Sequence, residues 1–330
     1  MINVGPMLFK EFAVRMRGSR SALLIGLYVA LALIAARLLY GAIITQIDQG
    51  APLLSAQIGQ VIFIGLSLGL QALTVFLAPA AALNAISSEY ERGTADLLIT
   101  TPLSPLQFVA GKLVSALAFT LLLLIAVLPV FAVVVLFGGV SSDDLVRVGV
   151  TLLVTALTGC LFGLCCSALT RQTYTATLIC YALLVTLIGG TLFAANVWSL
   201  ANGMRAAPPA LIVANPISAM ASALVPTQPP AVSFTGGLRP LVLLSLMSRG
   251  MIETGALGGP VPLYRASIVL YLGLALVLFW ASLRLAPPRR TWRINTLDVA
   301  LFIVFLGYLV LLYGAREWWL PGLGIVSEQP

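Results

Sequence analysis

The sequence is dominated by apolar runs long enough to cross a lipid bilayer as helices. Such a helix needs about 20 predominantly apolar residues to cross roughly 30 Å of hydrocarbon. Six long runs and a shorter seventh cover residues 21–43, 58–85, 107–137, 145–169, 173–195, 266–286 and 297–314. Hydrophobic residues make up 60% of the chain and charged residues only 9%. Soluble domains carry about 25% charged residues. We therefore predict an all-α polytopic membrane protein.

The runs divide a single predicted transmembrane domain, residues 1–330, into successive parts. Residues 1–20 precede the first span, and residues 21–196 contain spans one to five. A long loop, 197–265, separates the fifth span from the sixth at 266–286. The seventh run, 297–314, adds a span to this core of six.

The positions of the basic residues predict the orientation. With the N-terminus inside, the cytoplasmic segments hold eleven of the 18 Lys and Arg residues. The positive-inside rule then places the N-terminus in the cytoplasm and the loop 197–265 outside. The net charge of +7 is thus explained by membrane topology rather than by nucleic-acid binding. A cleaved signal peptide is the alternative for the first 40 residues, but the apolar run continues past the "ALA" at 30–32.

Several kinds of chemistry are excluded by what the sequence lacks. There is no histidine, which removes Ser/His and Cys/His catalysis and most zinc sites. The four cysteines lie inside predicted spans and are interpreted as packing residues. No acidic residue lies in the interior of a span, where an ion-driven carrier usually needs one. "VAGKL" at 109–113 lacks the first glycine and the hydroxyl residue of a nucleotide-binding loop. We expect no enzyme activity in this chain, and energy for uphill transport would come from a separate ATPase.

Residues 87–107, "SSEYERGTADLLITTPLSPLQ", form a polar interruption between the second and third spans. Ser88 with Glu91 three residues later predicts a capping box at the start of a short helix. Pro102 stops this helix, because the residue before a proline is pushed out of the α region. Pro105 then suits the first position of the next span. An ordinary solvated loop is the alternative interpretation.

The stretch "EYERGTADLLITTPLSPLQFVAGKL", 89–113, resembles the signature of ABC-2 type transporter permeases. "LFKEFAVRMRGSRSALL" at 8–24 resembles the start of that family, and weaker similarity extends to "NPISA" at 215–219. The resemblance implies that residues 87–102 form a cytoplasmic coupling helix seated in a cleft of an ABC ATPase subunit. It also implies two permease copies, identical or related, with ATP and Mg²⁺ bound by the partner ATPase and no cofactor in this chain.

Carried over to this sequence, the resemblance assigns ATPase-coupling roles to eleven residues. Polar contacts are expected from Glu89, Glu91, Arg92 and Asp96, and the apolar seat from Tyr90, Leu97 and Leu98; Gly93, Thr94, Thr101 and Pro102 complete the segment. For Gly93, close approach of the partner and a merely tolerated helix glycine are both open.

The first 20 residues predict a helix along the inner membrane surface. Lys10, Arg15 and Arg17 offer positive charge to lipid phosphates, with Glu11 on the same segment. The resemblance implies that an interfacial helix here also touches the ATPase. A plain positive-inside anchor is the alternative.

The outer loop 197–265 holds nine prolines, and its apolar pieces are interrupted or too short for a confident span. Re-entrant or interfacial helices fit this pattern, and an extra pair of spans is the alternative. Glycine pairs at four-residue spacing, Gly65/Gly69 and Gly159/Gly163, predict close helix packing within one subunit or across a dimer.

Together these features predict the permease subunit of a dimeric ABC exporter in the inner or plasma membrane, contacting lipid and a separate ATPase. A membrane scaffold or immunity-type protein that transports nothing is the main alternative, and a secondary carrier is a third. No cluster of residues selects a substrate, which could be a lipid, a hydrophobic drug, a peptide or a polymer.

Overall fold

The computed structural model describes residues 19–47, 55–93, 105–203, 208–227, 262–287 and 296–323, and every element in these ranges is a helix. Within them, seven helices are long and apolar enough to cross a membrane. They are α2 (Ser19–Ile47), α3 (Ser55–Glu91), α5 (Pro105–Leu136), α6 (Ser142–Thr170), α7 (Thr173–Ala201), α10 (Leu263–Leu285) and α11 (Thr296–Gly314). Each predicted apolar run is thus a helix, and the all-α polytopic fold is confirmed.

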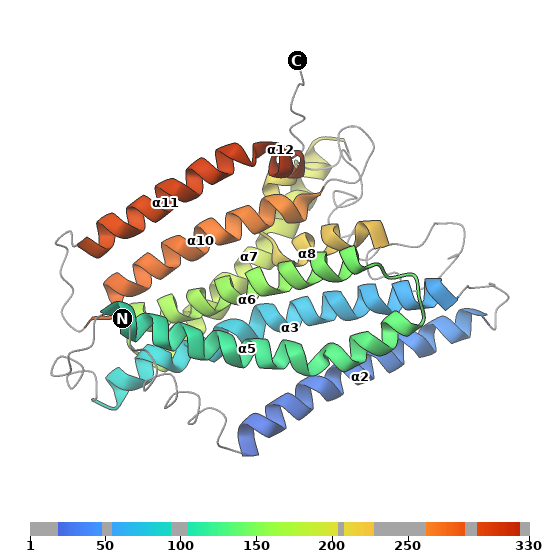
Figure 1. The fold of residues 1–330 in the computed structure, drawn as a ribbon, viewed down its shortest axis with the longest axis horizontal. Coiled ribbons are helices and arrows are strands. Elements are labelled where there is room, and N and C mark those ends of the chain that lie inside the picture. The colour runs from blue at the N-terminus through green and yellow to red at the C-terminus, as the bar shows by residue number, and fades with distance from the viewer. Residues whose placement is uncertain are drawn as a thin grey trace.

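Successive long helices run in opposite directions, so the bundle has two ends. At the end on the left of Figure 1, α3 stops and α5 starts; we call this the elbow end. The opposite end carries the short helix α8 (Pro216–Leu224) and we call it the α8 end. The short elements η1 (Pro209–Leu211), η2 (Val225–Thr227), α12 (Arg316–Trp319) and η4 (Leu320–Leu323) complete the described fold.

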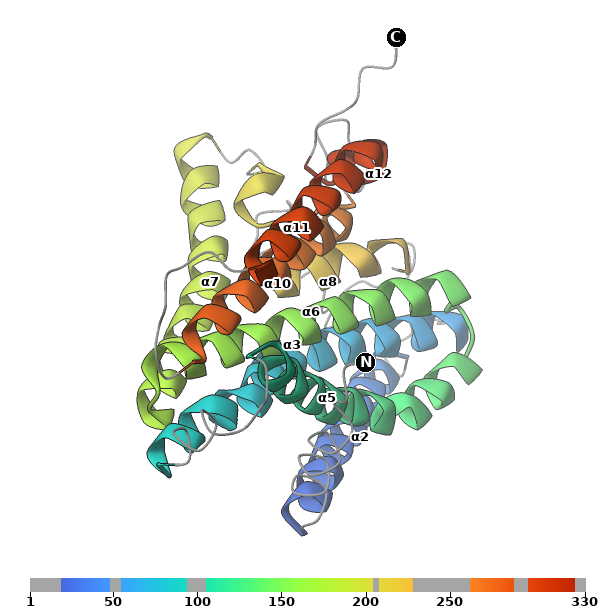
Figure 2. The same ribbon diagram turned by 60° about the vertical axis from the view of Figure 1, so that its left-hand side comes forward.

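Helices α3 and α6 form the centre of the bundle. They are the two spans with the largest buried share, whereas the most apolar window of α11 has no buried residue. Figure 2 shows α2 and α7 diverging from this central pair on different sides. The exposed faces of α2, α7 and α11 are strongly apolar, as expected for helices whose solvent is lipid.

Two glycines allow α6 to lie directly on α3. A Cβ atom on Gly163 would stand 2.4 Å from the Pro79 carbonyl oxygen, and one on Gly159 would stand 3.1 Å from the Ala78 Cβ. This pair therefore packs within one chain. The other predicted pair behaves differently, because Gly65 faces Leu39 of α2 while Gly69 has open space around it.

Helix α8 is a short, buried helix in the part of the outer loop that is described. Eight of its nine residues are buried. Asn215 caps its start, since its side-chain oxygen accepts hydrogen bonds from the N–H groups of Ile217 and Ser218. The Asn215 amide also donates to Ile188 O at 3.1 Å and to Thr191 Oγ1 at 2.9 Å on α7. A nine-residue helix cannot span a bilayer, which is consistent with the predicted re-entrant or interfacial helix.

The start of α8 lies deep in the bundle. Gln71, near the middle of α3, donates to the Pro216 carbonyl at 2.9 Å and to Thr155 Oγ1 at 2.9 Å. On α10, the Tyr271 hydroxyl donates to Ala214 O at 2.9 Å. These bonds supply partners for backbone carbonyls that lipid could not satisfy.

The four cysteines are free thiols within spans, as predicted, and Cys160, Cys166 and Cys180 are buried. The Cys160 thiol lies 3.4 Å from Ala78 O at the α3–α6 contact. They pack between helices and form no disulfide framework.

Candidate functional site

The last turn of α3 corrects the predicted start of the coupling helix. Ser88 lies inside α3, with its hydroxyl donating to Asn84 O, and the helix continues unbroken to Glu91. The expected capping box at Ser88 and Glu91 is therefore not formed, and residues 87–91 are the last residues of α3. Gly93, at φ +67°, ends the helix in the left-handed conformation that glycine adopts without strain.

Glu91 holds the first turn of α7. Its carboxylate accepts a hydrogen bond from the Thr173 N–H at 2.6 Å and another from the Thr173 hydroxyl at 2.9 Å. Gln172, the N-cap residue of α7, makes no side-chain cap of its own. A negative charge at this point satisfies a free N–H and interacts favourably with the helix dipole. Glu91 thus caps α7 from a different helix.

Glu89 holds the first turns of α5. Lys112 is 4% exposed, and its ammonium lies 2.5 Å from Glu89 Oε1 and 5.4 Å from the centre of the Phe108 ring. A buried ammonium is costly unless it is paired, and the Glu89 carboxylate supplies Lys112 with such a partner.

Tyr90 and Arg171 hold the end of α10. The Tyr90 hydroxyl donates to Ala286 O at 2.8 Å, and Arg171 donates to Pro287 O at 3.0 Å. The Arg171 guanidinium also lies over the Tyr90 ring, 4.6 Å from its centre. Arg171 is the C-cap of α6 with φ +57°, an uncommon conformation for a residue with a side chain. These contacts fix it there.

Six side chains at the elbow end therefore act together: Glu89, Tyr90, Glu91, Lys112, Arg171 and Thr173, which we call the elbow cluster. Three consecutive residues of α3 each bond to a different helix or helix end. The Ser167 hydroxyl of α6 adds to this, accepting from the N–H groups of Ile86 and Ser87 at 3.2 and 2.9 Å. The end of α3 is consequently tied to α5, α6, α7 and α10.

Only part of the sequence-predicted site lies in the described residues. Glu89, Tyr90 and Glu91 bond to neighbouring helices, and Glu91, Arg92 and Gly93 are exposed at the end of α3. Ten predicted residues lie outside the described ranges: Thr94, Asp96, Leu97, Leu98, Thr101, Pro102, Lys10, Glu11, Arg15 and Arg17.

Three members of the elbow cluster were not predicted as site residues. Lys112 lies in the segment that carries the family resemblance, but its partner is 23 residues away in sequence. Arg171 is one of the eleven basic residues of the predicted cytoplasmic segments, and the sequence around it does not indicate a contact with Tyr90. Thr173 has no signal of its own, since a threonine at the start of an apolar run is common.

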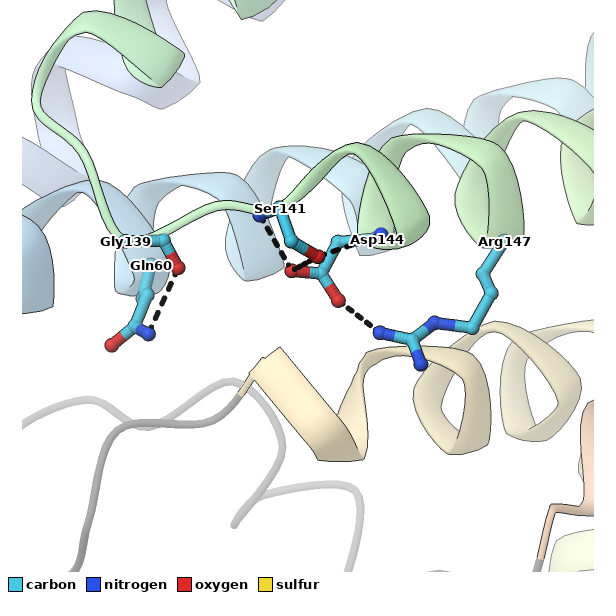
Figure 3. Close-up of polar contacts among 5 residues, drawn as sticks. All are labelled: Gln60, Gly139, Ser141, Asp144 and Arg147. Atoms are coloured by element: carbon cyan, nitrogen blue, oxygen red, sulfur yellow. Dashed lines mark hydrogen bonds and ion pairs between the residues drawn. The ribbon is translucent and has the colours of Figure 1, made fainter.

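A second polar group lies at the α8 end, where α5 connects to α6 (Figure 3). Ser141 and Asp144 form a capping box at the start of α6, and Asp144 pairs with Arg147 one turn later. Gln60 of α3 donates to Gly139 O at 2.9 Å. A Cβ on Gly139 would stand 2.4 Å from Ala56 O, so this connection needs glycine. The connection between α5 and α6 is thus bonded to α3 at the α8 end.

Between the two ends, a cavity of about 280 Å³ lies beside the start of α8. Its lining comes from five helices and is almost entirely apolar, with Thr155, Thr158 and Tyr271 as the polar residues. The cavity is a space for apolar material at the depth of the bundle centre.

The geometry defines a multi-pass helical membrane protein in which the elbow cluster connects several helices at one end. A family model described as ABC-2 family transporter protein matches residues 7–314. The chain belongs to this family of ABC transporter permeases. No curated protein matches it at a significant level.

Proposed function

We propose that this chain is the transmembrane subunit of an ATP-driven exporter. Two permease copies would work with separate ATPase chains, which bind ATP and Mg²⁺ and dock on the segment that follows α3. The elbow end would face the cytoplasm, in line with the basic residues concentrated there. Hydrolysis would then take place outside this chain, and the membrane would be the inner or plasma membrane.

The observation that carries this proposal is the elbow cluster. A partner pressing on the segment after α3 must move several helices together if a passage is to open. Glu89, Tyr90 and Glu91 connect the end of α3 to α5, α10 and α7. Movement of this end would therefore be transmitted to α5, α10 and α7 together.

The contacts of the cluster support two different roles for residues to which the resemblance assigns a single role, contact with the ATPase. Glu89, Tyr90 and Glu91 make bonds within the chain, so their proposed role is transmission of movement. Arg92 is exposed at the tip, so its proposed role is direct contact with the ATPase. The two roles predict different phenotypes, which makes them testable.

The test is purification of the tagged chain from its native membrane, followed by assays in nanodiscs and vesicles. We expect the wild-type chain to retain an ABC ATPase and to transport only with ATP. R92E is expected to lose the ATPase, whereas R316E, a charge reversal at the α8 end, is expected to keep it. E91Q is expected to keep the ATPase and its hydrolysis but to lose transport.

Failure of the wild-type chain to retain any ATPase would contradict the proposal and favour a scaffold. Transport in ATP-free vesicles under an ion gradient would contradict it in favour of a carrier.

A further inference from the structure

The apolar cavity beside the start of α8 extends to the lipid-facing surface of α7. Among its lining residues, Leu183 and Leu187 of α7 are 51% and 37% exposed, whereas Val75 of α3 and Tyr271 of α10 are buried. Its volume is about 280 Å³. A dry apolar cavity of about 150 Å³ is already large enough to bind benzene. A molecule larger than benzene can therefore be accommodated here, and it can enter from the bilayer.

One polar group at the wall of this cavity has no hydrogen-bond partner in the described part of the chain. Gln71 is fully buried, and its side-chain nitrogen donates to Thr155 Oγ1 and to Pro216 O at 2.9 Å each. Both of these partners line the cavity. The side-chain oxygen, Oε1, belongs to the same amide group, and it is buried without a partner. An unpaired buried acceptor is costly, so a donor supplied at this point would be bound favourably.

The neighbours of Gln71 determine which way its amide group points. The Thr155 hydroxyl uses its proton in a bond to Thr151 O at 2.8 Å, and Pro216 offers a carbonyl oxygen. Both neighbours are therefore acceptors toward Gln71, and turning the amide over would place its oxygen against them. The nitrogen must face Thr155 and Pro216, which leaves Oε1 as the unpaired acceptor.

The other polar groups around the cavity have no donor to spare. The Tyr271 hydroxyl donates to Ala214 O at 2.9 Å. The Thr158 hydroxyl has one proton and two carbonyl acceptors, Val154 O at 2.9 Å and Tyr271 O at 3.2 Å. At the start of α8, two backbone N–H groups are bonded to the cap residue Asn215. The polar groups described around this cavity thus offer acceptors and no free donor, and no lining residue carries a charge.

We propose that this cavity binds a neutral apolar molecule that carries a hydroxyl group and enters from the bilayer. The hydroxyl donates to Gln71 Oε1, and the apolar body lies against Val75, Phe162 and Leu184. The site is separate from the elbow cluster, so the proposal does not rest on coupling to an ATPase.

The shortage of donors selects the alcohol among polar apolar-bodied molecules. A ketone, an ether or an ester has no proton to give to Gln71. An amide has one, but it also brings a carbonyl for which the cavity has no donor. An ammonium group would be costly among apolar walls. An alcohol therefore satisfies the acceptor and adds the least unpaired polar surface.

The test is photolabelling of the full chain in lipid vesicles. One probe is an octanol that carries a diazirine group, and the other is the methyl ether of the same molecule. Mass spectrometry locates the labelled residues, and labelling of the lipid-facing side of α11 corrects for the concentration of each probe in the membrane. We expect the alcohol to label Phe162 at least about fivefold more than the ether does. Unlabelled octanol should compete with the alcohol probe, and octyl methyl ether should not.

Two variants test the location and the acceptor. L187W places a large side chain at the lipid-facing opening of the cavity, and it is expected to reduce labelling of Phe162 at least about fivefold. L311W makes the same change on the exposed side of α11 and should label as wild type does. Q71M replaces the amide with an apolar side chain of similar length, so the alcohol and the ether should label this variant equally.

Equal labelling by the two probes in the wild-type chain would overturn the proposal, and it is the result expected if a buried water molecule satisfies Gln71 instead. Unchanged labelling of Phe162 in L187W would overturn the location. A preference for the alcohol that persists in Q71M would overturn the assignment of the acceptor. These measurements need neither transport nor an ATPase, so their outcome is independent of the proposed function.

Discussion

The carboxylate of Glu91, at the end of α3, caps the first turn of α7 through the backbone N–H and hydroxyl of Thr173. The two residues are 82 positions apart in sequence. Helix caps are usually local, whereas this one joins the second span to the fifth. A displacement of the end of α3 would therefore also move the start of α7.

Removing this charge should weaken the link without unfolding the protein. We expect E91Q to lower the free energy of unfolding by about 1 kcal/mol, because the neutral amide is a weaker acceptor at a helix N-terminus. Thermal unfolding of the purified chain in nanodiscs measures this. E317Q, in the short helix α12, is the control and should change stability by less than about 0.5 kcal/mol. A larger loss for E317Q than for E91Q would contradict the capping role.

The pair of Glu89 and Lys112 should show strong coupling in a double-mutant cycle. E89Q removes the carboxylate that is paired with the buried Lys112 ammonium. We expect this to cost about 2 kcal/mol, less than for a fully buried pair, because Glu89 is partly exposed. K112M, with an apolar side chain of similar length, should partly restore stability when combined with E89Q. Denaturation of the four proteins gives the coupling energy. Simple additivity would show that the two side chains do not depend on each other.

The contact of Gly163 with Pro79 should tolerate no side chain. We expect G163A to destabilise the chain by roughly 1–3 kcal/mol, since its Cβ would collide with backbone atoms of α3 that cannot move aside. G149A lies in the same helix with open space around it and should be neutral or stabilising, because alanine favours a helix over glycine. Melting temperatures of the two variants decide the matter. Similar values would contradict the close contact.

Asn215 should be needed both as a cap and as a brace between α8 and α7. N215S keeps a side-chain oxygen that can cap α8 but loses the two hydrogen bonds donated to Ile188 and Thr191, while N215A loses both functions. We therefore expect stability to fall in the order wild type, N215S, N215A, with a total loss of roughly 2–3 kcal/mol. N202A, at the exposed end of α7, is the control. An unchanged unfolding temperature for N215A would rule out the brace.

The spans could be predicted from the sequence because the bilayer fixes the length of an apolar helix. The runs at 145–169 and 297–314 differ from α6 and α11 by only a few residues at either end. The short helix α8 was also predictable, since Asn215 and Pro216 are typical of a helix start and the piece is too short to span a bilayer. In such a chain the lipid bilayer determines the length of the helices, and side-chain packing determines how they are arranged.

The elbow cluster could not be predicted, because its contacts depend on how distant helices meet. Tyr90 bonds to Ala286, 196 residues later, and no local pattern indicates that contact. The predicted capping box at Ser88 was wrong for a related reason. A serine followed by a glutamate three residues later is equally compatible with a helix interior, where the hydroxyl bonds back to the carbonyl one turn earlier.

Helices α3 and α6 meet at Gly163 with no side chain between their backbones. A shift of one against the other by even a fraction of an ångström would press carbonyl oxygen onto Cα, so we expect the two to stay fixed as one body through any working cycle. In the proposed transport cycle, movement that opens a passage would then occur elsewhere, where α2 or α7 slides on this fixed pair or between the two copies of the proposed dimer.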